Sequence, residues 1–81
     1  MSIMKMRVKL TYPQDKIKEP ILFKMARKYE VMPNIRRARV TDTVGEMVLE
    51  LEGTQDGIDK GLAFMRKQGI VVELVVGDII E

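Results

Sequence analysis

The chain opens with a segment in which apolar and polar residues alternate. The even positions from 4 to 12 hold Met4, Met6, Val8, Leu10 and Tyr12, and the positions between them hold Lys, Arg or Thr. Because successive side chains of a strand point to opposite faces, this period predicts a strand with one buried and one solvated face. Residues 46–52 and 70–76 alternate in the same way, so both are predicted to be strands as well.

Two further segments carry apolar residues at helical spacing. Residues 21–29 form an apolar stripe with a basic face opposite to it, and Pro20 precedes them at a place typical of the first turn of a helix. Residues 55–68 form a second stripe, with Thr54 as the predicted N-cap and Gly69 where a left-handed cap is needed. Both segments are predicted to be helices.

Residues 34–41 are predicted to form a strand in which the alternation of apolar and polar positions shifts by one residue. The apolar positions change from odd, at Ile35, to even, at Val40. A β-bulge adds one residue to a strand and would reconcile the two halves, so we expect a bulge near Arg36 and Arg37. A polar turn then joins this strand to the next one, and the two are predicted to form a hairpin.

The predicted elements follow in the order βαββαβ, with no repeat, linker or low-complexity stretch between them. The compact arrangement for this order is a ferredoxin-like α+β sandwich, an antiparallel sheet of strand order 4-1-3-2 with both helices on one face. A chain of 81 residues closes only one hydrophobic core, so residues 1–81 are predicted to form a single domain. Its core is expected over about residues 6–76, with 77–81 as a short tail.

The tail contains two isoleucines, Ile79 and Ile80, for which this fold has no core position. Contact with a second subunit would withdraw both from water. Self-association is therefore expected.

The composition limits the chemistry that is available. Hydrophobic residues make up 46% and charged residues 32%, as in a soluble globular protein. The chain has no cysteine, no histidine and no phosphate-cradling glycine loop, so we expect no enzymatic activity, no cofactor and no metal site. It also has no secretory signal and no apolar stretch near the roughly 20 residues of a membrane span, which predicts a cytoplasmic protein without membrane insertion.

Charge is distributed unevenly along the chain. The first 40 residues hold eleven Lys or Arg against three Asp or Glu, and the remainder hold three against nine. In the predicted strand order, basic and acidic strands are neighbours, so much of this asymmetry should be neutralised within the sheet. Cross-strand pairs are expected between Arg7 or Lys9 and the carboxylates of Glu50, Glu52 and Glu73.

The basic edge strand is also compatible with two other functions, RNA binding and protein–protein interaction. Arg36, Arg37 and Arg39 cluster there, and RNA-recognition domains share this topology. Those domains stack bases on aromatic residues of the central strands, and residues 45–52 contain none, which argues against nucleic acid as a partner. A protein–protein adaptor that uses the basic edge stays open, although edge strands also carry charge simply to prevent aggregation.

Three segments together resemble the NIL domain family. They are Pro33–Val40, Gly45–Gly53 with its Leu-Glu-Leu-Glu-Gly ending, and Arg66–Glu73, and the resemblance runs from about Val8 to Leu74. NIL domains are ferredoxin-like folds at the C-terminus of the ATPase subunit of methionine-uptake ABC transporters, and some are fused to iron–sulfur ferredoxins. In the transporter they bind methionine and regulate uptake.

The resemblance implies a non-enzymatic small-ligand-sensing or regulatory module that binds an amino acid such as methionine. It implies a homodimer as the working unit, with a separate transporter or ferredoxin as a possible partner. It also implies a ligand site at Asn34 and Ile35, although Asn34 after Pro33 would suit a turn equally well. The family's Asn-Ile-Leu has a leucine where this chain has Arg36. Arg36 either lines a different, more anionic pocket or lies at the bulge. The candidate ligand-binding residues are therefore Asn34, Ile35, Arg36 and Arg37.

Overall fold

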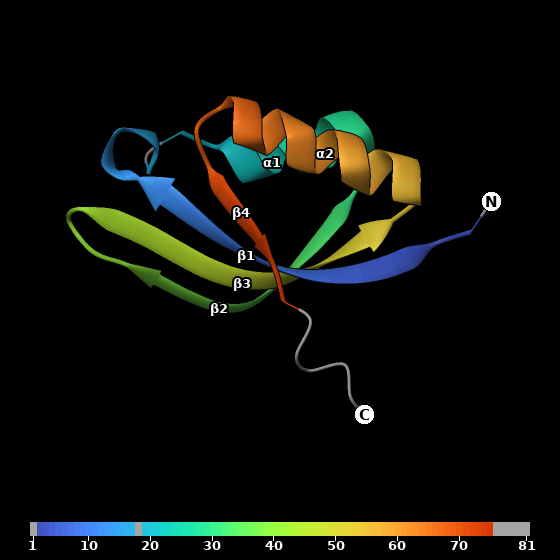
Figure 1. The fold of residues 1–81 in the computed structure, drawn as a ribbon, viewed down its shortest axis with the longest axis horizontal. Coiled ribbons are helices and arrows are strands. Elements are labelled where there is room, and N and C mark those ends of the chain that lie inside the picture. The colour runs from blue at the N-terminus through green and yellow to red at the C-terminus, as the bar shows by residue number, and fades with distance from the viewer. Residues whose placement is uncertain (1, 18, 76–81) are drawn as a thin grey trace.

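The computed structural model describes residues 2–17 and 19–75 (Figure 1). Its elements are β1 (Met4–Pro13), the short 3-10 helix η1 (Gln14–Lys16), α1 (Ile21–Tyr29), β2 (Met32–Val40), β3 (Val44–Gly53), α2 (Gln55–Lys67) and β4 (Val71–Leu74). The predicted βαββαβ order is confirmed.

The four strands form one antiparallel sheet of order β2-β3-β1-β4. This is the predicted order 4-1-3-2 counted from the other edge. Both helices lie on the same side of the sheet, and the opposite face is open (Figure 1). The predicted ferredoxin-like α+β sandwich is therefore confirmed, with β2 and β4 as its two edge strands.

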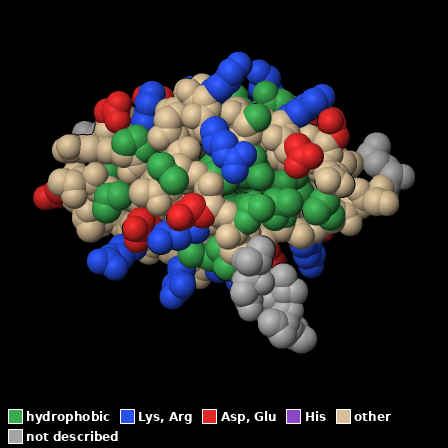
Figure 2. All heavy atoms as spheres, viewed as in Figure 1, with side chains coloured by type: hydrophobic (Ala, Val, Ile, Leu, Met, Phe, Trp, Pro, Cys, Tyr) green, Lys and Arg blue, Asp and Glu red, His purple; other side chains and the backbone are tan. Residues whose placement is uncertain are grey.

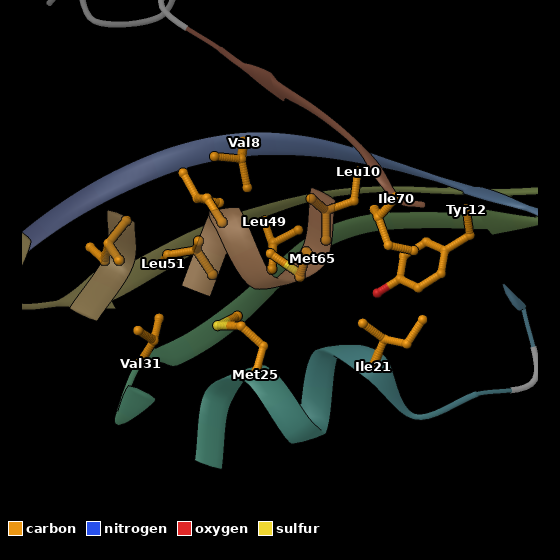
Figure 3. Packing of buried hydrophobic residues seen from close by; sticks show 12 residues of the cluster. Val8, Leu10, Tyr12, Ile21, Met25, Val31, Leu49, Leu51, Met65 and Ile70 are labelled. Carbon is orange, nitrogen blue, oxygen red and sulfur yellow. The ribbon is translucent and has the colours of Figure 1, made fainter. Parts of the chain in front are cut away.

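The hydrophobic core lies between the helices and the sheet (Figure 3). The sheet contributes the alternating inward residues of β1 and β3, and both helices contribute one apolar stripe each. The buried residues are Val8, Leu10, Tyr12, Ile21, Met25, Val31, Leu49, Leu51, Ile58, Leu62, Met65 and Ile70. All polar and charged side chains in the described part of the chain remain at least partly accessible to solvent.

The ends of the helices follow local chemistry. The Thr54 hydroxyl accepts a hydrogen bond from the Gly57 N–H at 3.1 Å, and Gly69 has a φ of 91°, so both predicted caps of α2 are confirmed. Pro20 lies just before α1 rather than inside its first turn, and Glu30 ends that helix in the left-handed conformation with a φ of 57°. A glutamate in this conformation is uncommon, and no sequence pattern predicted it.

The edge strand β2 contains the predicted bulge but begins earlier than expected. Its pairing with β3 shifts register between Ile35 and Arg37. The strand starts at Met32, so Pro33 and Asn34 both lie within it rather than in the preceding turn. The interpretation of Asn34 as a turn residue is therefore wrong. A proline is tolerated here because β2 is an edge strand.

The open face carries the predicted pairing of Arg7, whereas Lys9 forms no ion pair with the described carboxylates. Arg7 of β1 and Glu50 of β3 form an ion pair of 3.1 Å, and Lys5 lies in register with Glu52. Lys and Arg side chains stand next to Asp and Glu side chains along the lower side of the molecule in Figure 2. The predicted tail, residues 77–81, lies outside the described residues.

Candidate functional site

The four predicted ligand-binding residues lie on β2 but not on one face. Asn34 is in register with Glu50 and Arg37 with Val48, which places both on the open face. Ile35 is in register with the buried Leu49, so it points to the helix side, where it is 51% exposed. Successive residues of a strand alternate between faces, which explains the separation.

Arg36 occupies the bulge itself. The register passes from Ile35 directly to Arg37, so Arg36 has no partner residue on β3. Such a residue is the extra one that a bulge inserts into its strand. The structure thus brings Asn34 and Arg37 together on the open face and sets Ile35 and Arg36 apart from them.

A shallow hollow of 420 Å³ lies on the open face next to Arg37. It is lined by Lys9, Arg37, Ala38, Arg39, Glu46, Met47 and Val48. Sequence reasoning missed Lys9, Glu46 and Val48 as site residues. The signal that could have identified them is the alternation of β3, in which Val48 interrupts a series of glutamates at positions 46, 50 and 52.

The helix side of β2 has a different character. Phe23 of α1 is 62% exposed and lies between two further hollows. One of them, of 180 Å³, reaches Val40 of β2, and the other, of 400 Å³, reaches Met32 and Pro33. This side of the edge strand is therefore apolar, whereas its open side is basic.

A second apolar area lies at the far edge of the sheet. In Figure 2, hydrophobic side chains gather between α2 and the first half of β1, with charged side chains above and below them. β4 is short and pairs with β1 only from Val8 to Thr11, and its Leu74 is 54% exposed.

Among the described residues, Tyr12 has a shifted pKa. Burial raises the pKa of the Tyr12 phenol above its ordinary 10.0. Tyr12 points into the core on the helix side (Figure 3), so it does not belong to the open-face hollow. Its shift is that of a tyrosine packed among apolar residues.

No group of three or more Asp or Glu side chains in residues 2–17 and 19–75 is placed to hold a metal ion. In the same part of the chain, neither helix is long and apolar enough to cross a membrane. What the open face does offer is one hollow lined by three cations, Lys9, Arg37 and Arg39, together with the carboxylate of Glu46 and the apolar side chain of Val48.

Comparison with known proteins connects this fold to a family. The sequence model of the family described as the NIL domain matches residues 6–74 of this chain. The chain belongs to the NIL domain family. The resemblance drawn from the segments of β2, β3 and α2–β4 is thereby confirmed.

The curated relatives of this NIL domain are much longer proteins. It is 31% identical over 70 residues to the methionine import ATP-binding protein MetN 1 of Bacillus anthracis, covering 82% of this chain and 20% of that protein. It is 32% identical over 71 residues to MetN of Myxococcus xanthus, covering 83% of this chain and 22% of that protein. The chain therefore spans about a fifth of the length of these relatives.

A solved structure supports the same fold. The C-terminal domain of an ABC transporter ATP-binding protein from Enterococcus faecalis superposes with a TM-score of 0.77, covering 90% of this chain and 86% of that one. The two sequences are 19% identical, so this likeness establishes the fold alone.

Proposed function

We propose that this NIL domain is a cytoplasmic, non-enzymatic regulatory module that binds an amino acid, with methionine as the first candidate. The observation that carries the proposal is the family match over residues 6–74, since the curated relatives that share this region are methionine import ATP-binding proteins. The matched region corresponds to a small domain, about a fifth of their length. Ligand sensing is a function that such a domain can perform without a catalytic centre.

The proposed direct ligand contacts are Asn34 and Arg37, and Arg36, the extra residue of the bulge, is proposed to have an indirect part. The amide of Asn34 combines a donor and an acceptor, and the Arg37 guanidinium suits a carboxylate. An amino acid presents a carboxylate and an ammonium, and these groups match that chemistry. Ile35 points away from these residues, so its proposed part in the site is indirect, through a second subunit.

The working unit is proposed to be a homodimer formed at the β2 edge. Apart from Pro33, every residue of β2 is exposed in the single chain. An edge strand with free backbone groups and an apolar side, here carrying Ile35 and Val40, is suited to association with a second copy. The regulated protein is proposed to be a separate transporter or ferredoxin partner.

A thermal-shift screen of the twenty amino acids tests the proposed function. A ligand present at 100 times its Kd adds about 2.7 kcal/mol to stability and raises Tm by roughly 10–20 °C for a domain of this size. We expect methionine to raise Tm and most other amino acids to leave it unchanged. A flat screen at millimolar concentrations would count against an amino-acid ligand.

A protein–protein adaptor is the second candidate function. It is favoured by the three arginines on the exposed β2 strand, with an apolar surface around Phe23 on the other side. An extended partner segment with alternating acidic and apolar residues would complement both sides of that edge. A flat amino-acid screen together with saturable binding of such a peptide would favour the adaptor.

A further inference from the structure

Charged side chains on the open face are arranged in rows that cross the strands. The rows place Lys5 beside Glu52, Arg7 beside Glu50, and Arg39 beside Glu46. In each of them a cation of β1 or β2 meets a carboxylate of β3, as favourable cross-strand pairs do. The row of Arg7 and Glu50 is closed by a direct ion pair of 3.1 Å.

The row at position 48 departs from this pattern. β3 places Val48 there instead of a glutamate, and its neighbours are Arg37 on β2 and Lys9 on β1. Within residues 2–17 and 19–75, neither cation has a carboxylate at ion-pair distance. Lys9 has Glu73 in register on its far side, so the row holds two cations and one carboxylate.

The spacing of the strands lets both cations serve one anion. Neighbouring strands lie about 4.8 Å apart, so Arg37 and Lys9, on the two sides of β3, have Cα atoms about 10 Å apart. Their long side chains can converge above the short side chain of Val48. A carboxylate placed there would occupy the position that a glutamate at 48 would have filled.

The hollow of 420 Å³ lies at this point of the face. Lys9, Arg37 and Val48 line it, and so does the carboxylate of Glu46. Its size falls within the range of small-ligand sites, about 300–1,000 Å³. Arg39, which lies in register with Glu46, lines it too, so the hollow carries three cations against one carboxylate, and this excess of positive charge suits the carboxylate of an amino acid.

We infer that this hollow is a carboxylate seat, in which Arg37 and Lys9 hold the carboxylate of an amino-acid ligand above Val48. The ammonium of the ligand points to Glu46, two residues from Val48 along β3. The choice of an amino acid as the ligand rests on the proposed function. The position of the carboxylate seat rests on the row at position 48, where Val48 stands in place of a glutamate between Arg37 and Lys9. Arg37 is the directional partner, because a guanidinium can donate two parallel hydrogen bonds to a carboxylate.

The test compares three probes by isothermal calorimetry. They are L-methionine, L-methioninamide, which lacks the carboxylate, and 4-(methylthio)butyric acid, which lacks the ammonium. The variants are Arg37→Gln and Lys9→Gln, with Lys5→Gln as the matched control because Lys5 already has Glu52 beside it in its row. Each variant is first checked for a wild-type circular dichroism spectrum.

The wild type is expected to bind methionine at least about tenfold more tightly than methioninamide, because hydrogen bonds to a charged group are lost with the carboxylate. Arg37→Gln and Lys9→Gln should each weaken methionine binding about tenfold and reduce its advantage over methioninamide. Lys5→Gln should leave both affinities within about twofold of the wild type, since it acts outside the hollow.

A further variant, Val48→Glu, places a carboxylate of the protein itself in the proposed seat. Val48→Glu restores the missing carboxylate of the row, so the glutamate should pair with Arg37 and Lys9 and compete with the ligand. We expect methionine affinity to fall by more than about tenfold while Tm stays equal or rises. A variant that binds methionine as well as the wild type would overturn the inference.

The outcomes separate the two proposals. If methionine binds the wild type and both Arg37→Gln and Lys9→Gln bind it equally well, the seat is wrong and the proposed function stands. If 4-(methylthio)butyric acid binds as tightly as methionine, Glu46 has no part in the seat. If no amino acid binds the wild type at millimolar concentration, the proposed function fails and the seat fails with it.

Discussion

Gly61 of α2 lies against the thioether of Met25 of α1, so closely that a Cβ at position 61 would come within 2.6 Å of the sulfur. One turn earlier, a Cβ at Gly57 would lie 2.8 Å from the backbone oxygen of Tyr29. These two glycines allow the helices to pack closely above the sheet. Glycine lowers the intrinsic stability of a helix, and here the close packing of α1 against α2 requires it at both positions.

Alanine at position 57 should be more destabilising than alanine at position 61. Alanine favours a helix by about 1 kcal/mol over glycine, but overpacking costs about 1–3 kcal/mol. At Gly57 the obstacle is backbone, whereas at Gly61 it is the flexible end of Met25. We expect Gly57→Ala to lower the free energy of unfolding by roughly 1–2 kcal/mol and Gly61→Ala to change it by less than about 1 kcal/mol.

Urea unfolding of both variants measures this difference. Asp59→Ala, at an exposed position of the same helix, is the control for helix propensity without packing. Equal loss at positions 57 and 61 would mean that α1 moves as a body to relieve either contact.

Much of the fold could be predicted because it depends on local patterns. The alternation of β1, the N-cap at Thr54 and the left-handed Gly69 each follow from residues close in sequence. The contact of Gly61 with Met25 could not be predicted, since it joins two helices whose relative position the sequence pattern does not specify. The left-handed conformation of Glu30 could not be predicted either, because glutamate has no preference for that conformation.

Stability should decrease at alkaline pH partly because of Tyr12. Its pKa is raised in the folded state by burial, so the folded chain holds the phenolic proton to higher pH than the unfolded chain, whose pKa is about 10.0. The contribution is fully present below pH 10 and is lost as the pH rises through the folded-state pKa.

Tyr12→Phe removes this contribution. Between about pH 9 and about pH 11 the variant should lose less stability than the wild type, measured from urea midpoints at each pH. Tyr29→Phe, which keeps Tyr12, is the control and should follow the wild type. Parallel curves for the wild type and Tyr12→Phe would show that the phenol of Tyr12 reaches water in the folded state.

The β2 edge should control self-association. Ile35 is half exposed on β2, and a charge there would place an unpaired cation in an interface. Leu74 on β4 has similar exposure at the other edge and provides a matched control. We expect Ile35→Arg to shift sedimentation velocity profiles from dimer to monomer at micromolar concentration and Leu74→Arg to leave them unchanged.

Two results would contradict this prediction. A wild type that sediments as a monomer at high micromolar concentration would remove the homodimer altogether. Loss of the dimer in Leu74→Arg alone would place the interface at β4.

The candidate site was only partly accessible from the sequence. The residues of β2 could be proposed, and the bulge near Arg36 could be predicted from its parity. The side to which each residue points depends on the register with β3, which separates Ile35 from Asn34 and Arg37. Lys9 joins the hollow from another part of the chain, since pairing of β1 with β3 brings it there.

Asn34 is the position at which the proposed site is most directly tested. It lies within β2 on the open face, with its side chain exposed, so it has no turn to maintain. Asn34→Ala should therefore change the free energy of unfolding by less than about 0.5 kcal/mol, as expected for a surface position. If the amide contacts the ligand, the same substitution should weaken methionine binding by roughly 1–3 kcal/mol, because a polar group of the ligand is left unpaired. Met32→Ala, two residues earlier in the same exposed strand, is the control and should leave affinity unchanged. Urea midpoints and calorimetric affinities measured on the same preparations decide the matter, and an Asn34→Ala variant with wild-type affinity would exclude Asn34 from the site.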